Sequence, residues 1–435
     1  PLGMRDKRHA VLGAANHKTF PLQCRDQRVN LGLVIHHVLD IAADGESDVP
    51  VGKFVTYVTQ LSQREHIEDS LGTGPNGPDL IAAVGKDLPG SAPKTIDASG
   101  LYVTPGLLDI HLHAYQRFGG WLHPDQANLP YGVTTCVDTG SSGWQHFPDF
   151  VETIIEPSTT RVLAFINIVG AGMLGAVEQD VSEMEPIPCA EMVARYPQHI
   201  IGVKTAHFGG SGWEAVETAI QAGELSQTPV MLDFWPRPTR TYPELILERM
   251  RPGDIHTHVY ARHIPTLDEN GKVADYMLEA RQRGILFDLG HGAGSFWWRV
   301  AVPAVQQGFL PDVISTDLHK RSALIPNANM LTTMSKCLNM GITLEDVILR
   351  STVKPAQAIH RPKLGHLSLE AEADIAVLNI RQGDFGFVDS GHARLRGSQK
   401  LESIMTVRNG RIVWDPNGLS WPDWETAGPY EVISH

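Results

Sequence analysis

Two histidines separated by one residue, His111 and His113, stand at the end of the apolar run "GLLDIHLH". Residues two apart in a β-strand point to the same face, so both imidazoles would face the same side. Imidazole is a common ligand for zinc, iron, manganese and similar divalent ions. Because the chain contains 20 histidines, one H-x-H pair is a weak signal by itself. The pair becomes evidence for a metal site only if other residues able to bind a metal stand at the ends of other predicted strands.

Later apolar runs also end in polar or titratable residues. In chain order these are Lys204, Asp233, His258, His291 and Asp317. Each one alone has an ordinary explanation, such as an ion pair, a helix cap or a hydrogen-bonded core histidine. Their shared placement is much harder to attribute to chance. Imidazoles and carboxylates suit a divalent ion, whereas an ammonium group has no lone pair to donate. Lys204 fits such a set only if its charge is removed, as carbamylation by carbon dioxide would do.

The elements that must position these residues are short apolar runs alternating with helix-like segments. Near-continuous apolar strands alternating with helices indicate a parallel sheet covered on both faces. Eight such units predict a (β/α)8 TIM barrel, in which the carboxyl ends of the strands face one mouth. The runs span 106–113, 133–138, 161–170, 200–206, 229–234, 254–260, 285–291 and 312–317.

The sequence on either side of the predicted barrel has a different pattern of predicted secondary structure. After about residue 364 it reads as short strands and tight turns, and the Asn409-Gly410 pair predicts a hairpin. The stretches 80–88 and 94–106 read the same way, whereas 11–79 gives mixed signals. We expect both chain ends to form a small β-sandwich domain. The predicted divisions are 1–104 and 359–435 for the sandwich and 105–358 for the barrel.

Composition narrows the classes of partner. The net charge of −13 would repel phosphate backbones, so nucleic acid is not expected as a partner. No run of about 18 apolar residues predicts a membrane span, and the start of the chain has no apolar signal core. The 4 cysteines form no CxxC pair, which fits a reducing cytoplasm. We therefore expect a cytoplasmic protein that acts on a small molecule, and a homo-oligomer remains open.

The sequence resembles the amidohydrolase superfamily, in the branch of dihydroorotase-like and deacetylase-like metallohydrolases. The resemblance covers most of residues 80 to 380. It implies two divalent metal ions, with zinc expected first, bridged by a carbamylated lysine and a hydroxide. The stretches that carry it are "IDASGLYVTPGLLDIHLH", "GVTTCVDTGSSG", "GVKTAH", "RPGDIHTHVY", "LFDLGHGAGSF", "VISTDLH" and "LGHLSLEAEADIAVLN".

The resemblance also implies a role for each matched position. His111 and His113, with Asp317, would hold the more buried ion. Carbamylated Lys204 would bridge the two ions, and His258 would bind the second.

One position departs from the family pattern. The fifth strand of these enzymes usually ends in a histidine ligand, whereas here it ends in Asp233. A carboxylate can still bind a hard divalent ion, so Asp233 is the first expectation for this ligand. His207 and His256 are the alternatives.

The resemblance predicts hydrolysis of an amide or ester in an N-acyl or O-acyl small molecule, as in deacetylases. Asp317 would accept a proton from the attacking water and pass it to the leaving group. The other predicted catalytic residue is Lys204, and the predicted substrate-binding residues are His291, His207 and Arg262, with Arg117 as a second arginine for a substrate carboxylate.

Two other functions stay open. A mononuclear deaminase of the same superfamily would use H-x-H, a further histidine and an aspartate, but it would lack the bridging lysine. A catalytically inactive dihydropyrimidinase-like scaffold would have lost its ligands. A serine hydrolase is set aside because the chain contains no G-x-S-x-G motif.

Overall fold

The computed structural model describes residues 33–36, 56–59, 79–85 and 94–429. The strands are β1 (Leu33–His36), β2 (Thr56–Thr59), β3 (Ala83–Gly85), β4 (Lys94–Asp97), β5 (Tyr102–Pro105), β6 (Leu107–Leu112), β7 (Val133–Gly143), β8 (Arg161–Asn167), β9 (Ile200–Thr205), β10 (Val230–Leu232), β11 (Ile255–His256), β12 (Leu286–Phe287), β13 (Ile375–Val388), β14 (Arg394–Arg408) and β15 (Arg411–Trp414). The α-helices are α1 (Pro124–Asn128), α2 (Phe147–Phe150), α3 (Pro186–Arg195), α4 (Glu214–Ser226), α5 (Tyr242–Glu244), α6 (Asp275–Gln282), α7 (Trp298–Gln306), α8 (Lys320–Leu324), α9 (Met330–Asn339), α10 (Leu344–Leu349) and α11 (Val353–Ala358).

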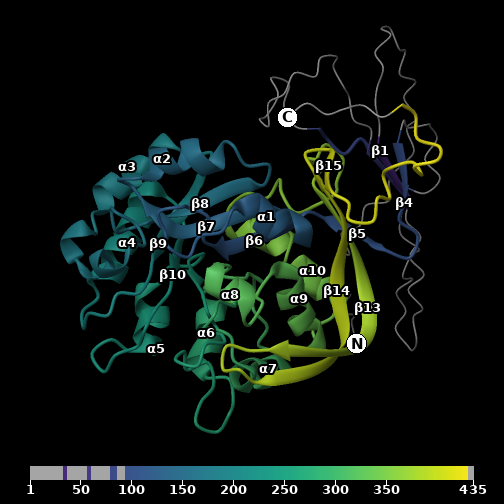
Figure 1. Ribbon diagram of the computed structural model, residues 1–435. Helices are drawn as coiled ribbons and strands as arrows, with labels where there is room; N and C mark the ends of the chain where they lie inside the picture. Colours follow the sequence, from purple (N-terminus) through teal and green to yellow (C-terminus); the bar gives the residue numbers. More distant parts are fainter. Residues whose placement is uncertain (1–32, 37–55, 60–78, 86–93, 430–435) are drawn as a thin grey trace, which may run out of the picture.

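The central element is a curled parallel sheet. Within the described residues it contains seven strands in the order β12-β11-β10-β9-β8-β7-β6. Helices α2, α3 and α4 cover part of its outer face (Figure 1), and the side chains of the barrel interior cover its inner face. Because both faces are covered, the strands are almost entirely buried, as their apolar sequences predict.

The eighth predicted strand closes the sheet without forming a regular ladder. Val313 makes a parallel bridge with Asp288 beside β12, and Leu318 makes one with Leu112 of β6. A positive φ of 46° at Asp317 takes this segment out of the extended region just before the bridge to Leu112, and Gly290, with a φ of 49°, does the same in the neighbouring seventh run. The segment therefore takes the position of a strand and completes the barrel. The predicted fold class is confirmed.

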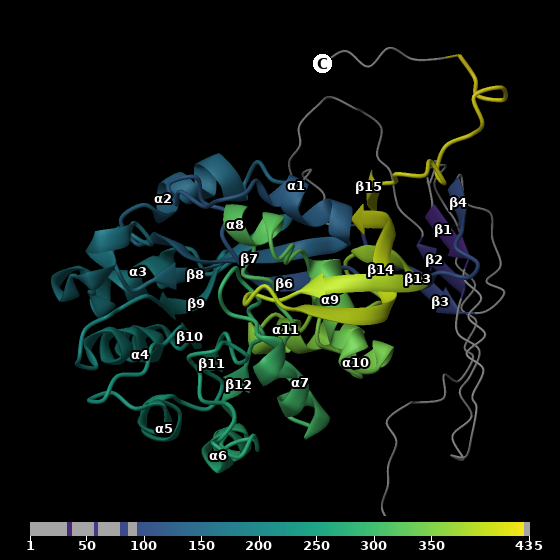
Figure 2. The same ribbon diagram turned by 60° about the horizontal axis from the view of Figure 1, so that its bottom comes forward.

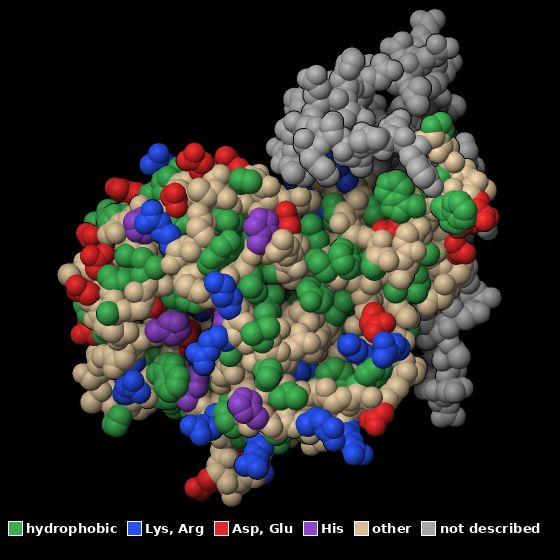
Figure 3. Space-filling view, in the orientation of Figure 1, with side chains coloured by type: hydrophobic (Ala, Val, Ile, Leu, Met, Phe, Trp, Pro, Cys, Tyr) green, Lys and Arg blue, Asp and Glu red, His purple; other side chains and the backbone are tan. Residues whose placement is uncertain are grey.

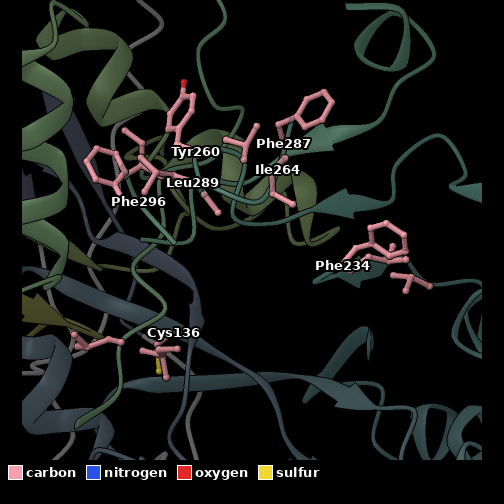
Figure 4. Packing of buried hydrophobic residues seen from close by; sticks show 14 of the residues in the cluster. Cys136, Phe234, Tyr260, Ile264, Phe287, Leu289 and Phe296 are labelled. Atoms are coloured by element: carbon pink, nitrogen blue, oxygen red, sulfur yellow. The ribbon is translucent and has the colours of Figure 1, made fainter. Parts of the chain in front are cut away.

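Apolar side chains form two layers around this sheet. The outer layer packs strands against helices and includes residues far apart in the chain, such as Cys136 and Phe296 (Figure 4). The inner cluster draws on every barrel strand, so it fills the barrel interior. Its members include Leu108, Val137, Leu163, Ile201, Met231, Ile255 and Val313, with Leu286 packed against them.

The two ends of the chain meet in the small β domain. Strand β5 pairs antiparallel with β13, and the resulting sheet has the order β15-β14-β13-β5 within the described residues. Asn409 and Gly410 have φ angles of 51° and 74°, as a two-residue hairpin turn requires, so the predicted hairpin between β14 and β15 is confirmed. Strands β1 to β4 form a second sheet in the order β3-β2-β1-β4. Apart from β1, β2 and Asp79, the stretch 11–79 lies outside the described residues, and so does Cys24.

The long β13–β14 ribbon links the small domain to the barrel. It lies beside α9 (Figure 2). Asn339 donates a hydrogen bond to the carbonyl of Gln399, 2.7 Å away, and Lys336 donates one to the carbonyl of Val388, also at 2.7 Å. In the part of the chain that the structure describes, no helix combines the length and apolar character needed to cross a bilayer.

Candidate metal centre

Three of the predicted ligands converge at the carboxyl end of β6. His111, His113 and Asp317 each offer a ligand atom, and these atoms lie within 4.8 Å of one another. Nε2 of His113 is 3.2 Å from Oδ1 of Asp317, and Nε2 of His111 is 3.8 Å from the same oxygen. All three residues are buried. A divalent cation would satisfy the lone pairs that meet here.

The other ring nitrogens of the two histidines are held by the protein. Nδ1 of His111 lies 3.2 Å from Oδ2 of Asp288 and 2.9 Å from the hydroxyl of Thr257. Nδ1 of His113 lies 2.9 Å from the hydroxyl of Ser141. Burial and the nearby charges of Lys204 and His258 lower the pKa of His111 far below its usual value, so the ring is neutral. With Nδ1 engaged, Nε2 of each ring is left to bind an ion.

Lys204 projects from β9 into the same buried region. Its side chain is 1% exposed, and its Nζ has no hydrogen-bond partner among the described residues. Burial lowers the pKa of this amine, although Asp233 and Asp317 act in the opposite direction. An unpaired amine is costly in such a place, so the site suits a lysine that carries another group. A carbamate would supply two oxygens as ligands.

A second group of polar side chains surrounds Asp233, which directly follows β10. Its Oδ2 lies 3.6 Å from Nε2 of His258 and 3.7 Å from Nε2 of His207. Nδ1 of His258 is 2.7 Å from the carbonyl of Gly290, and Nδ1 of His207 is 2.9 Å from Glu178. His258 and His207 therefore both direct Nε2 toward the carboxylate of Asp233.

The carboxylates of both groups are ionised. Burial alone would raise the pKa of Asp317, but the hydrogen bond with His113 and the charge of His258 hold it below its usual value. Burial also acts to raise the pKa of Asp233, yet His258, His207 and Lys204 outweigh it and bring it to about 2. Both carboxylates are therefore available to bind a cation near neutral pH.

Four other singled-out residues have different surroundings. His256 packs edge-on against Tyr242, with ring centroids 4.9 Å apart, in the outer core layer. His291 is buried between Lys336, whose Nζ is 2.6 Å from Nε2, and the carbonyl of Gly292, 2.9 Å from Nδ1. Arg262 is exposed above the ring of Trp297 at 5.4 Å, and Arg117 pairs with Asp149. None of these contacts is to a predicted metal ligand.

Sequence reasoning missed three residues that support the centre. Asp288, a carboxylate inside the apolar run "ILFDLGH", orients His111, and that unusual position was a usable signal. Glu178 follows no strand, so nothing in the sequence marks it as the partner of His207. Gly140 has a φ of 84°, and a Cβ there would lie 2.8 Å from Cγ of Lys204.

Histidine side chains also reach the surface near the barrel. On the face shown in Figure 3 they gather with basic side chains around a small hollow, over the region of β10, α6 and α8.

Comparison with known proteins gives consistent relatives. No protein-family profile matches the chain. A deacetylase of Agrobacterium fabrum is 33% identical over 371 residues, which are 79% of this chain and 90% of that protein. A solved dihydroorotase has a TM-score of 0.73 and 27% identity, covering 88% of this chain and 98% of its own. A solved adenine deaminase has a TM-score of 0.72 and 28% identity, covering 77% of this chain and 93% of its own.

Proposed function

Because the chain belongs to the amidohydrolase superfamily, in its deacetylase-like and dihydroorotase-like branch, we propose that it is a metal-dependent hydrolase of N-acyl or O-acyl small molecules. The observation that carries this proposal is the buried meeting of His111, His113 and Asp317 near the unpaired amine of Lys204. The name of the curated relative favours removal of an acetyl group.

Two divalent ions fit the donor groups present. His111, His113 and Asp317 would hold the first ion, and zinc suits this mixture of imidazole and carboxylate. Asp233 and His258 would bind the second ion. Lys204 would join the two as a carbamate, which also gives its buried nitrogen a role. When bound, such ions lower the pKa of water toward neutrality and polarise a carbonyl oxygen.

The residues of the chain then have distinct tasks. Asp317, ionised and beside His113, accepts the proton of the attacking water and gives it to the leaving nitrogen or oxygen. Asp288 and Ser141 keep the two imidazoles oriented through Nδ1. Burial of the site keeps bulk water away from the reacting carbonyl. The roles predicted for His291 and Arg262 in substrate binding remain proposals.

The cellular setting is also a proposal. Cys136, Cys189 and Cys337 are buried free thiols, which supports a reducing compartment such as the cytoplasm. We propose a small molecule, rather than nucleic acid, as the partner, since the net charge of −13 disfavours phosphate backbones.

A mononuclear deaminase is the second candidate, because one similar solved structure is an adenine deaminase. The buried Lys204 favours the binuclear hydrolase, since a mononuclear site has no use for a bridging carbamate. An inactive scaffold has no need to retain the buried set of His111, His113 and Asp317.

Elemental analysis together with a substrate screen tests the proposal. The purified protein should hold two divalent ions per chain and hydrolyse members of a library of N-acyl amino acids, cyclic imides, lactones and acetyl esters. One ion with release of ammonia from aminopurines would indicate the deaminase, and no bound ion would indicate the scaffold.

A further inference from the structure

We propose that His207 is a ligand of the second divalent ion and replaces the imidazole that β10 lacks. Strand β10 is followed by Asp233, so the second ion would otherwise have only His258 as an imidazole ligand. This inference rests on the proposed binuclear hydrolase, and it makes Glu178 the residue that positions His207.

Distances around Asp233 fit ligands that share a cation. Its Oδ2 is 3.7 Å from Nε2 of His207 and 3.6 Å from Nε2 of His258. Both separations are too long for a hydrogen bond. Two atoms that bind one tetrahedral zinc ion at about 2.1 Å lie roughly 3.4 Å apart. The spacing is therefore that of neighbouring ligands.

The far side of His207 is anchored as metal-binding histidines usually are. Its Nδ1 is 2.9 Å from Oε2 of Glu178. Glu178 is only 4% exposed, and its other oxygen accepts a hydrogen bond from the backbone N–H of Gly175. A carboxylate that engages Nδ1 fixes the ring orientation and makes Nε2 a stronger ligand.

The backbone at His207 is held in an uncommon conformation. Its φ is 59°, in the left-handed region that residues other than glycine seldom adopt. Gln179 secures this turn, since it donates to the carbonyl of His207 at 2.8 Å and accepts from the N–H of Gly209 at 2.7 Å. Left-handed residues held by their surroundings cluster at functional sites, and His258, with a φ of 61°, has the same feature.

The side chain of His207 is open to solvent on one side. Its side chain is 48% exposed, whereas that of Asp233 is 7% exposed. The atoms around Asp233 are less compact than the set of His111, His113 and Asp317. An ion bound here would draw these atoms together while Nδ1 of His207 stays in contact with Glu178.

Zinc titration of purified variants, followed by elemental analysis, tests this assignment. The wild-type chain should bind two zinc ions. His207→Ala should keep the first and bind the second at least 10-fold more weakly. Glu178→Gln should weaken the second ion by about 10- to 100-fold, because His207 loses its orientation. Thermal melting checks that each variant folds, and His207→Gln is the second variant if alanine unfolds the turn.

Rescue and control variants sharpen the result. Asp233→His should restore tight binding of the second ion in the His207→Ala background, because it returns an imidazole to the end of β10. His360→Ala is the matched control, since this exposed histidine has a similar φ of 54° and should leave both ions bound. Two tightly bound ions in both His207 variants would overturn this inference and leave the hydrolase intact. A single ion in the wild type would also overturn it, whereas no ion would overturn the proposed function itself.

Discussion

At the scale of single residues, each ring nitrogen of the two candidate histidine ligands has a separate role. The imidazoles of His111 and His113 are fixed through Nδ1 and point Nε2 at Asp317. Lys204 stands apart because its buried amine has no partner among the described residues. The proposed metal bridge through a carbamate would account for both facts.

Asp317→Asn should leave the fold intact and reduce turnover by about 10²- to 10⁴-fold, because the amide cannot take up the proton of the attacking water. Steady-state kinetics on the substrate found in the screen measures the loss, and circular dichroism checks folding. Glu279→Gln, which changes an exposed carboxylate on α6, is the control. A normal rate in Asp317→Asn would require a different proton carrier.

The sequence identified most of the predicted ligands but not the residues that hold them. His111 and His113 could be found because they share one face at the end of an apolar run. Glu178 could not be found, since its contact with His207 depends on how two loops approach each other. Asp233 follows the strand that was expected to carry an imidazole, and its Oδ2 lies 3.6 Å from Nε2 of His258; its role as a ligand stays a prediction.

At the scale of elements, the barrel strands carry the site, and their close approach restricts which residues are allowed. Lys204 on β9 lies directly over Gly140 of β7, where a Cβ would come within 2.8 Å of Cγ. Eight alternating units were enough to predict the barrel. The irregular closure was not predictable, because it arises from backbone angles at Gly290 and Asp317.

Gly140→Ala should displace Lys204 and weaken metal binding, because the added Cβ meets the middle of the lysine side chain. A left-handed alanine also costs about 1–2 kcal/mol of stability. Gly308→Ala separates the two effects, since Gly308 has a similar φ of 81° with nothing within 4 Å of its Cβ position. Zinc titration should show weaker binding in Gly140→Ala alone, and equal binding in both variants would contradict the packing argument.

The contact between α9 and β13 should make stability depend on pH. Burial lowers the pKa of Lys336 from 10.5 to about 7 in the folded chain. Between these values the unfolded chain binds more protons, so this group makes the free energy of unfolding rise from pH 7 to pH 10.5. Urea midpoints across this range should rise more steeply in the wild type than in Lys336→Met. Exposed Lys363→Met should follow the wild type, and identical slopes in all three proteins would refute the effect.

At the scale of the whole molecule, segments from before and after the barrel pair beside it, and the candidate site lies at the mouth of its strands. Strand β5 comes just before the first barrel strand, yet it pairs with β13 from the far end of the chain. The candidate metal site likewise joins His111 and His113, at the end of β6, with Asp317 from the segment after β12. Bound ions should therefore stabilise the folded chain as a unit.

Removal of metal by a strong chelator should lower the melting temperature, and added zinc should restore it. An ion that binds only the folded chain contributes about 2.7 kcal/mol when its free concentration is 100 times its Kd. Differential scanning calorimetry measures the change. Lys204→Ala should respond less, because its second ion has lost the bridge. An unchanged melting temperature in the wild type would argue against tight binding.

A crystal structure of the metal-loaded protein at a resolution that shows the Lys204 side chain is the most direct test of the central claim. The account predicts a carbamate on Nζ whose two oxygens contact two cations, one held by His111 and His113 and the other beside Asp233. A free amine on Lys204 that touches no cation would contradict it.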